Sequence, residues 1–412
     1  MTRPASTTDA PLIERVLRPF QQFIATEAAS GIVLLATTAL ALALANSPLA
    51  SSYQHALEIP LAVGLRPFRL ELSLHEWVND ALMAVFFFLV GLEMKRELLV
   101  GDLSTRRSAT LPVAAALGGM LAPAAIYLLI NRGGVGSRGW GIPMATDIAF
   151  ALGVLALLGR RVPNGLRVFL AALAIADDLG AVLVIAIFYS AGLDWLAIGG
   201  AVLLLAFLAV LNARGMTRWY LYALAGIALW SLVLRSGVHA TIAGVLLAFV
   251  IPARTGATME HALRGVVAFV VMPIFALANA GVALSGSAAA ATSPIAWGIL
   301  LGLVIGKPLG ISLASRVAVR SGAAELPPGT TWRDVRGAGW LGGIGFTMSL
   351  FIASLAFGSG ALLDVAKLGV IAASIVSGVT GYTLLRLGAR RADATAAGTG
   401  ETEGGSPPEP RG

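Results

Sequence analysis

Cysteine is absent from the 412 residues of this chain, and charged residues are scarce, at 12% of the total. The lack of cysteine excludes disulfide bonds, thiolate metal sites and cysteine nucleophiles together. Although the formal net charge is +7, no soluble segment is large enough to carry a basic face for reading nucleic acid. We therefore expect no nucleic-acid partner, and we expect the positive charge to follow membrane topology.

Apolar sequence, by contrast, is abundant. Hydrophobic residues make up 57% of the chain, its mean hydropathy is +0.83, and continuous apolar runs recur along its length. A membrane β-barrel would instead show short segments that alternate with a period of two. The sequence predicts an all-α polytopic membrane protein of twelve transmembrane helices. Its spans are expected near 24–45, 77–99, 109–130, 139–158, 164–189, 195–212, 219–234, 238–251, 262–284, 295–315, 338–357 and 365–386.

Lysine and arginine are divided unequally between the two sides that twelve spans define. Most of them lie on the side of the N-terminus, and the connecting segments of the other side hold Arg66, Arg69, Arg132, Arg138, Arg235 and Lys367. Under the positive-inside rule both termini are cytoplasmic. The triplet Ala43-Leu44-Ala45 resembles a processing site and could instead end a cleavable signal peptide, but removal of the first span would spoil this charge pattern.

These features predict a cytoplasmic N-terminal lead over 1–22 and a single twelve-helix domain over 23–387. Residues 388–412 are rich in Gly, Glu, Ser, Pro and Arg, so a disordered cytoplasmic tail is expected there. Between the first two spans, alternating apolar residues over 59–72 predict an external β-hairpin, with an ordered loop as the alternative. Because a lone hairpin is marginal in water, we expect it to pair, for example with a second copy of itself.

Two adjacent acids, Asp177 and Asp178, interrupt an apolar run that continues for more than 20 residues after Asn164. A run of that length crosses a hydrocarbon core of about 30 Å, which puts both carboxyl groups near mid-membrane. Ionised groups are expensive there, so we interpret the pair as functional rather than structural. The two side chains point about 100° apart, and they can line one cavity while titrating as a coupled pair. Because carboxylate oxygens suit hard cations, a small alkali cation and protons would compete for them.

A motif in the fourth predicted span is echoed in the eleventh. Residues 139–147 read GWGIPMATD and residues 339–347 read GWLGGIGFT, so both join Gly-Trp to helix breakers and then to threonine. By span count the two motifs run in opposite directions, which is typical of substrate sites built from broken helices. Helix packing by small residues is the alternative role for these glycines and prolines.

Broken helix ends carry partial charges, positive at N-termini and negative at C-termini. Asp147 follows the first break directly, and Lys307 lies inside a predicted span, so both are available to balance these charges. Lys307 and Asp177 each lie about 13 residues, or roughly 20 Å, from the membrane entry of helices that start on opposite faces. They can therefore meet at the midplane. A lysine partner favours the ionised carboxyl group, whereas desolvation and a neighbouring carboxylate favour its protonation.

Seven segments, in order along the chain, resemble the NhaA family of bacterial Na⁺/H⁺ antiporters. They are VGLEMKREL (90–98), ATDIAFALG (145–153), AIADDLG (174–180), GVHAT (237–241), ANAGV (278–282), IGKPLG (305–310) and GIGFTMS (343–349). The resemblance covers about residues 20–386. It implies inverted repeats with crossed, discontinuous fourth and eleventh helices, for which this family is an established example. It also implies an exchanger that expels Na⁺ or Li⁺ while admitting a larger number of protons.

Carried over by motif, the resemblance implies that Asp178 and Asp177 are the ion and proton carriers and hold the transported Na⁺. Lys307 would be the partner of Asp177. Thr146 and Asp147 would lie at the helix crossing, whose glycines would be Gly342, Gly343 and Gly345. The ions are substrates, so no cofactor is expected. In family terms the hairpin joins two protomers into a dimer within the lipid of the bacterial inner membrane.

The resemblance further assigns pH activation to the cytoplasmic end of the second span. The matching residues are Glu93, Arg96 and Glu97, and further candidates are His239, Glu260 and His261. A solvated helix end held by local ion pairs is the alternative for the first three, and packing at a helix start is the alternative for His239.

Two other functions remain open beside a non-enzymatic, electrogenic, pH-activated antiporter that works by alternating access. A sodium-coupled symporter of an organic anion could share the architecture, but it would need polar groups for the anion. An intramembrane aspartyl protease also keeps two acids in the membrane, on separate helices that face one water. Adjacent acids do not meet that requirement, whereas Asp177 together with Asp147 could meet it.

Overall fold

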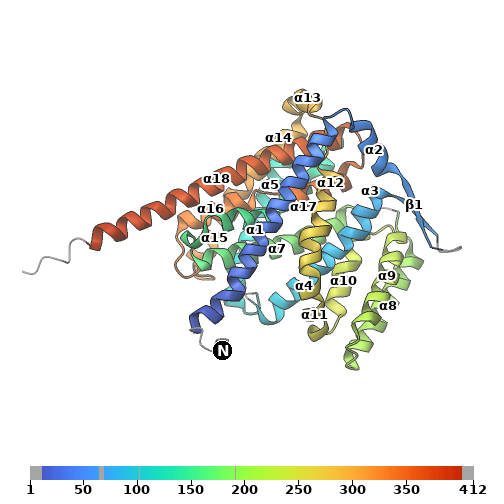
Figure 1. Ribbon diagram of the computed structural model, residues 1–412, viewed down its shortest axis with the longest axis horizontal. Coiled ribbons are helices and arrows are strands. Elements are labelled where there is room, and N and C mark those ends of the chain that lie inside the picture. Colours follow the sequence, from blue (N-terminus) through green and yellow to red (C-terminus); the bar gives the residue numbers. More distant parts are fainter. Residues whose placement is uncertain (1–11, 65–68, 102, 191, 401–412) are drawn as a thin grey trace, which may run out of the picture. The chain divides into compact units, whose positions relative to one another are not determined.

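A computed structural model of the protein describes residues 12–64, 69–101, 103–190 and 192–400, with the backbone alone for residues 12–28, 160 and 389–400. It is almost entirely helical (Figure 1). The α-helices are α1 (Leu12–Ala45), α2 (Ala50–Glu58), α3 (Leu74–Glu76), α4 (Met83–Val100), α5 (Arg106–Ile130), α6 (Ile148–Leu157), α7 (Asn164–Phe188), α8 (Trp195–Ala213), α9 (Trp219–Arg235), α10 (Ile242–Val250), α11 (Ala253–Val266), α12 (Met272–Asn279), α13 (Ser287–Thr292), α14 (Pro294–Leu301), α15 (Lys307–Arg320), α16 (Trp332–Gly342), α17 (Phe346–Phe357) and α18 (Ala361–Gly400). The 3-10 helices are η2 (Val135–Met144), η3 (Gly159–Arg161) and η5 (Leu284–Gly286), and the π-helical segments are η1 (Trp77–Leu82), η4 (Val267–Val271) and η6 (Gly302–Gly306).

The length and apolar character of these helices make the chain a polytopic α-helical membrane protein. Within the described residues, seven helices are long and apolar enough to cross a membrane, or up to ten if each of three bent pairs is one span. Two of these pairs are η2 with α6 and α16 with α17, and each is bent by 43° at its break. The count of twelve stays a prediction, because α9 and α10 have 17 and 9 residues and are short for a hydrocarbon core.

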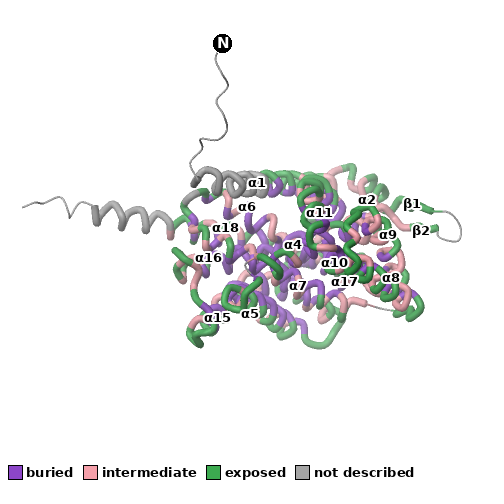
Figure 2. Tube along the Cα trace, turned by 90° about the horizontal axis from the view of Figure 1, so that it is seen from below, coloured by how far each residue is buried: buried purple, intermediate pink, exposed green. Residues whose placement is uncertain are grey.

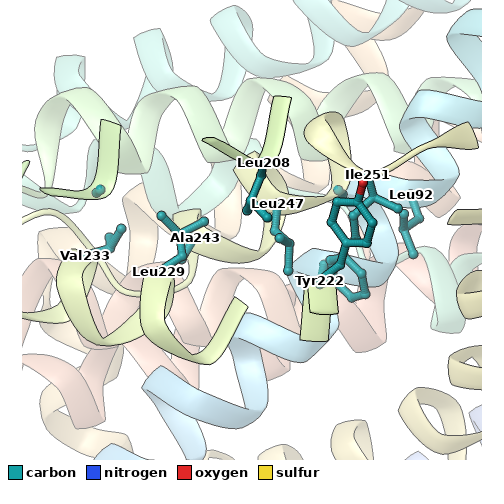
Figure 3. Packing of buried hydrophobic residues seen from close by; sticks show 11 residues of the cluster. Leu92, Leu208, Tyr222, Leu229, Val233, Ala243, Leu247 and Ile251 are labelled. Carbon is teal, nitrogen blue, oxygen red and sulfur yellow. The ribbon is translucent and has the colours of Figure 1, made fainter. Parts of the chain in front are cut away.

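The chain divides into two compact units that are interleaved along the sequence. The first contains residues 1–96, 148–157 and 186–284, and the second contains residues 97–147, 158–185 and 285–412. In the first unit α1 packs on α6 and α12, and α8 packs on α9 and α10. Figure 3 shows a core of this unit, in which Tyr222 and Leu229 of α9 meet Leu208 of α8 and Leu247 of α10. Close packing of these apolar side chains keeps the short helix α10 in place against α8 and α9.

In the second unit α5 packs along α15, and their backbones touch at one pair of glycines. A Cβ atom on Gly310 would overlap the carbonyl group of Gly118, and a Cβ atom on Gly118 would overlap the carbonyl group of Gly310. Close backbone approach of this kind is how small residues pack helices in membranes. In the same unit α16 and α14 lie against α18, and α17 lies against η2. The buried residues of α7 and α17 appear in purple in Figure 2.

The helix starts differ from the predicted ones because the prediction followed apolar runs, whereas helices begin at polar caps. The Thr105 side chain accepts a hydrogen bond from the Ser108 N–H, so α5 begins three residues before the expected 109. A capping box of Thr331 and Asp334 starts α16 well before the expected 338.

Both ends of the chain carry more helix than predicted. α1 begins at Leu12, inside the expected lead over 1–22. α18 continues to Gly400, so residues 388–400, for which a disordered tail was predicted, are described as helix. That segment is rich in alanine and arginine, which have high helix propensity, and it extends a helix that has already been nucleated. Residues 1–11 and 401–412, for which a lead and a disordered tail were predicted, lie outside the described residues.

The predicted β-hairpin over 59–72 is confirmed. β1 (Pro60–Val63) pairs antiparallel with β2 (Leu70–Ser73), and Leu61 stands opposite Leu72. The indole of Trp77 donates a hydrogen bond of 3.1 Å to the Leu61 carbonyl oxygen and holds the strand to the helix that follows. All of β1 is exposed, and residues 65–68, between the two strands, lie outside the described residues. Which side of the membrane the hairpin occupies stays a prediction.

Candidate functional site

The two adjacent acids lie at the middle of α7, where both are buried. Asp177 is 0% and Asp178 is 1% exposed. The Oδ1 atom of Asp177 has no hydrogen-bond partner among the described residues. A buried carboxylate oxygen without a donor is costly in a protein interior, so this atom is available to a ligand.

Lys307 reaches the first of these acids from α15. Its ammonium nitrogen lies 2.6 Å from Oδ2 of Asp177, and both side chains are fully buried. The same ammonium group donates a hydrogen bond to the carbonyl oxygen of Met144, the last residue of η2. A buried charge needs a counter-charge and further hydrogen bonds, and here one lysine has both.

The breaks of the two interrupted spans meet in the second unit. The backbone N–H of Asp147 donates to the Ile344 carbonyl oxygen at 2.6 Å, and the Thr146 hydroxyl donates to the Gly342 carbonyl oxygen at 2.9 Å. The carboxylate of Asp147 accepts from the Thr347 N–H at 3.0 Å and also from the Thr347 hydroxyl. Backbone groups that the breaks release are thus bound by protein, as a membrane interior requires.

Two of the broken ends therefore face a group of suitable charge, and a third is capped by a neutral hydroxyl group. The Asp147 carboxylate lies at the positive N-terminus of α17, and the Lys307 ammonium lies at the negative C-terminus of η2. The neutral hydroxyl of Thr146 caps the last carbonyl of α16, and Thr146 also contacts the Asp177 carboxylate. One connected set of polar groups joins Asp177 on α7 to both breaks.

The glycines of the second break allow the backbone to approach its neighbours. A Cβ atom on Gly343 would lie 2.5 Å from the Leu303 carbonyl oxygen, and one on Gly345 would overlap the Ser349 hydroxyl oxygen. At Gly342 the nearest atom, Cδ1 of Ile311, would lie 2.9 Å away. All three have ordinary packing conflicts rather than a left-handed backbone, since none has a positive φ.

Replacement of Thr347 by valine is expected to destabilise the protein by about 1–3 kcal/mol, because a buried carboxylate loses a hydroxyl donor while the side-chain shape is kept. Thermal unfolding in detergent would measure this loss. The matched control is Thr383→Val, which removes an exposed hydroxyl that bonds only to its own helix. Equal effects of the two substitutions would show that the Asp147 contact contributes little.

Of the six candidates for pH regulation, the structure brings three together in the first unit. Glu260 of α11 accepts from Arg96 of α4 at 3.1 Å and from Arg264 at 2.6 Å, and Arg264 also lies 3.3 Å from Glu93. We refer to Glu93, Arg96, Glu260 and Arg264 as the charge cluster. Glu260 is buried, which distinguishes this set from a solvated helix end.

The structure places the other three candidates differently. His239 lies 3.9 Å from Asp80, which precedes Glu93 by 13 residues and hence about 20 Å along the same span. His261 is exposed. Glu97 is buried and belongs to the second unit.

Sequence reasoning did not select Thr347 or Arg264 as site residues. Thr347 ends the echoed motif, as Thr146 does in the first copy, so its place after a helix break was a signal that could have been used. Arg264 follows Glu260 by one helical turn, and this spacing favours an ion pair.

Buried carboxylates and a lysine at the meeting point of two broken membrane helices define the architecture of a secondary transporter. The family model described as Na⁺/H⁺ antiporter 1 matches residues 21–385. The chain therefore belongs to the Na⁺/H⁺ antiporter 1 family.

Individual relatives are similar over most of their length. The chain is 48% identical to the Na⁺/H⁺ antiporter NhaA of Koribacter versatilis, over 90% of this chain and 92% of the relative. It is 50% identical to NhaA 1 of Klebsiella pneumoniae, over 90% and 96% respectively. It is 49% identical to NhaA of Escherichia coli O6:K15:H31, over 90% and 98%.

Proposed function

We propose that the protein is a secondary Na⁺(Li⁺)/H⁺ antiporter in which Asp177 and Asp178 form one shared site for cation and proton. Membership of the antiporter family supports the exchange reaction. The observation that carries the site is the pair of buried carboxyl groups at the middle of α7, one of them held by Lys307. Their oxygens are hard ligands that suit an alkali cation.

The exchange follows from competition for these oxygens. With both carboxyl groups ionised, a cation that enters the site binds Asp178 and draws Asp177 away from Lys307. Protons that arrive from the other side neutralise the carboxylates and displace the cation, and the protonated site then returns. Because a carboxyl group must lose its proton before it binds sodium, exchange falls when the cytoplasm is acidic.

The broken spans give the site its capacity to move between two open states. The backbone groups at the broken helix ends are hydrogen-bonded by Asp147, Lys307 and Thr146. Because no regular helix crosses either break, the two halves of each broken span can tilt at low cost. We infer that the twelve spans form inverted repeats, with both termini in the cytoplasm and the protein in the bacterial inner membrane. If more than one proton enters per sodium, the cycle is driven by the membrane voltage.

The test uses everted membrane vesicles with an established pH gradient and a fluorescent pH probe. Addition of Na⁺ or Li⁺, with no organic solute present, is expected to dissipate the gradient. Dissipation only when an organic anion is also present would favour the symporter. Cleavage of a model membrane substrate, with no effect of sodium on the gradient, would favour the aspartyl protease.

The charge cluster is proposed to take part in pH activation. Glutamine at position 260 removes the charge that pairs with Arg96 and Arg264, so Glu260→Gln is expected to shift the activation of exchange toward alkaline pH. The control Glu325→Gln removes an exposed partner of Arg107 and is expected to leave the profile in place. If the pH profile of exchange were unchanged in Glu260→Gln, the charge cluster would have a structural role alone.

The hairpin is proposed to join two protomers by edge-to-edge pairing. The Leu74 N–H bonds to the Ile59 carbonyl oxygen, and the antiparallel alternation then turns the N–H of Ala62 toward the open edge of β1. Ala62→Pro removes that donor and is expected to weaken the dimer roughly tenfold in light scattering, whereas Ala62→Ser keeps it. A dimer of unchanged strength in the proline variant would place the contact elsewhere.

A further inference from the structure

A cavity of about 410 Å³ lies between α16 and α18 in the second unit. One wall comes from α16, and the other comes from the last turn of the apolar part of α18, which ends as a candidate span at Gly388. α16 and α18 lie side by side (Figure 1). The lining residues are Arg333, Arg336, Trp340, Leu384, Leu387 and Gly388.

The two walls are held at a fixed distance by glycine contacts just inside the cavity. A Cβ atom on Gly337 would lie 2.5 Å from Cδ2 of Leu385, and one on Gly381 would lie 2.7 Å from Cδ2 of Leu341. Since residues 337 and 341 meet 385 and 381 in reverse order, the two helices are antiparallel. The cavity is therefore formed by packed helices before any ligand arrives.

The two arginines of the cavity form no ion pair with any residue that the structure describes. Nε of Arg336 donates a hydrogen bond of 3.3 Å to the Trp332 carbonyl oxygen, which leaves the remaining guanidinium donors of Arg336 available. The nearest acid in sequence, Asp334, bonds instead to Thr331 in the capping box. Guanidinium groups bind phosphate oxygens in a bidentate manner, so two neighbouring arginines suit a phosphate group.

The other wall of the cavity is apolar and faces outward. Leu384 is 41% and Leu387 is 52% exposed, and both lie in the final turn of a membrane span. Trp340 lies beside them, and tryptophan is favoured at the boundary between headgroups and hydrocarbon. A charged wall and an apolar wall thus meet at the level where lipid headgroups meet acyl chains.

We propose that this cavity binds an anionic phospholipid, with its phosphate on Arg333 and Arg336 and its acyl chains over Leu384 and Leu387. Basic pockets between membrane helices are suited to anionic headgroups. Free phosphate would use only the charged wall, and an acidic peptide would not match the outward apolar surface. This binding goes beyond ion exchange and does not depend on it.

Native mass spectrometry of the delipidated full chain, titrated with phosphatidylglycerol or phosphatidylcholine, tests the proposal. We expect one tight phosphatidylglycerol adduct that phosphatidylcholine does not replace. At about 1 kcal/mol for each arginine, the affinity is expected to fall about fivefold in Arg333→Gln or Arg336→Gln and about 30-fold in the double variant. Arg320→Gln, which removes an exposed arginine at the end of α15, is the matched control and should leave the affinity unchanged.

Retained sodium exchange in vesicles would show that the double variant is folded. The proposal is overturned if phosphatidylcholine binds as tightly, or if the double variant keeps the affinity of the natural chain. It is also overturned if millimolar inorganic phosphate displaces the lipid, since the site would then be one for a free anion. Binding that occurs only after removal of residues 401–412 would assign the cavity to the chain's own terminus.

Discussion

Asp178→Asn is expected to abolish the dissipation of a pH gradient by Na⁺ or Li⁺ in everted vesicles, with a loss of at least about 100-fold. Asparagine has nearly the shape of aspartate but carries no charge and exchanges no proton at this position. Removal of one charge from a buried site costs about 3–5 kcal/mol, which corresponds to a factor of more than 100 in binding. Glu58→Gln, at an exposed position on α2, is the control and should exchange normally.

A variant Asp178→Asn that kept normal exchange would contradict the assignment of the site to α7. Asp177→Asn distinguishes the roles of the two acids, because this substitution also leaves the Lys307 ammonium group without its counter-charge. We therefore expect Asp177→Asn to lower both exchange and thermal stability, and Asp178→Asn to lower mainly exchange.

Lys307→Met is expected to destabilise the protein by about 3–5 kcal/mol, because it leaves the ionised Asp177 buried without a partner. The change also removes the donor to the Met144 carbonyl oxygen at the end of η2. Thermal unfolding in detergent would measure the loss, with Arg320→Met as the control for removal of a positive charge at an exposed position.

The double variant Asp177→Asn with Lys307→Met tests whether this loss comes from the pair. With both charges removed, most of the lost stability is expected to return, since neither side chain is left charged in a dry site. If the two single effects simply add, the Asp177 and Lys307 side chains do not stabilise each other. The observed contact would then be incidental to stability.

The parts of the site that the sequence predicted depend on local information. Asp177, Asp178 and Lys307 are charges inside apolar runs, and depth along a helix follows from residue number alone. Their placement at one level could therefore be inferred before the structure. The hairpin over 59–72 was also local, because alternation and a short turn lie within one segment.

Other parts depend on contacts between distant segments. The bond from Thr347 to Asp147 joins residues 200 positions apart, and no periodicity in the sequence specifies it. The pairing of Arg264 with Glu93 joins α11 to α4 in the same way. The described end of α18 differs from the predicted one because composition suggested disorder, whereas alanine and arginine have high helix propensity.

The contact between Gly118 and Gly310 has a mechanical consequence for transport. Because the backbones touch at these two glycines, α5 and α15 have little freedom to slide, and we expect the backbone at the start of α15 to act as a fixed pivot. The ammonium group of Lys307 lies at the end of a flexible four-carbon side chain attached to that fixed backbone. In the proposed exchange, a cation takes the place of the ammonium group at Asp177, so we expect the Lys307 side chain to move while the backbone of α15 stays in position.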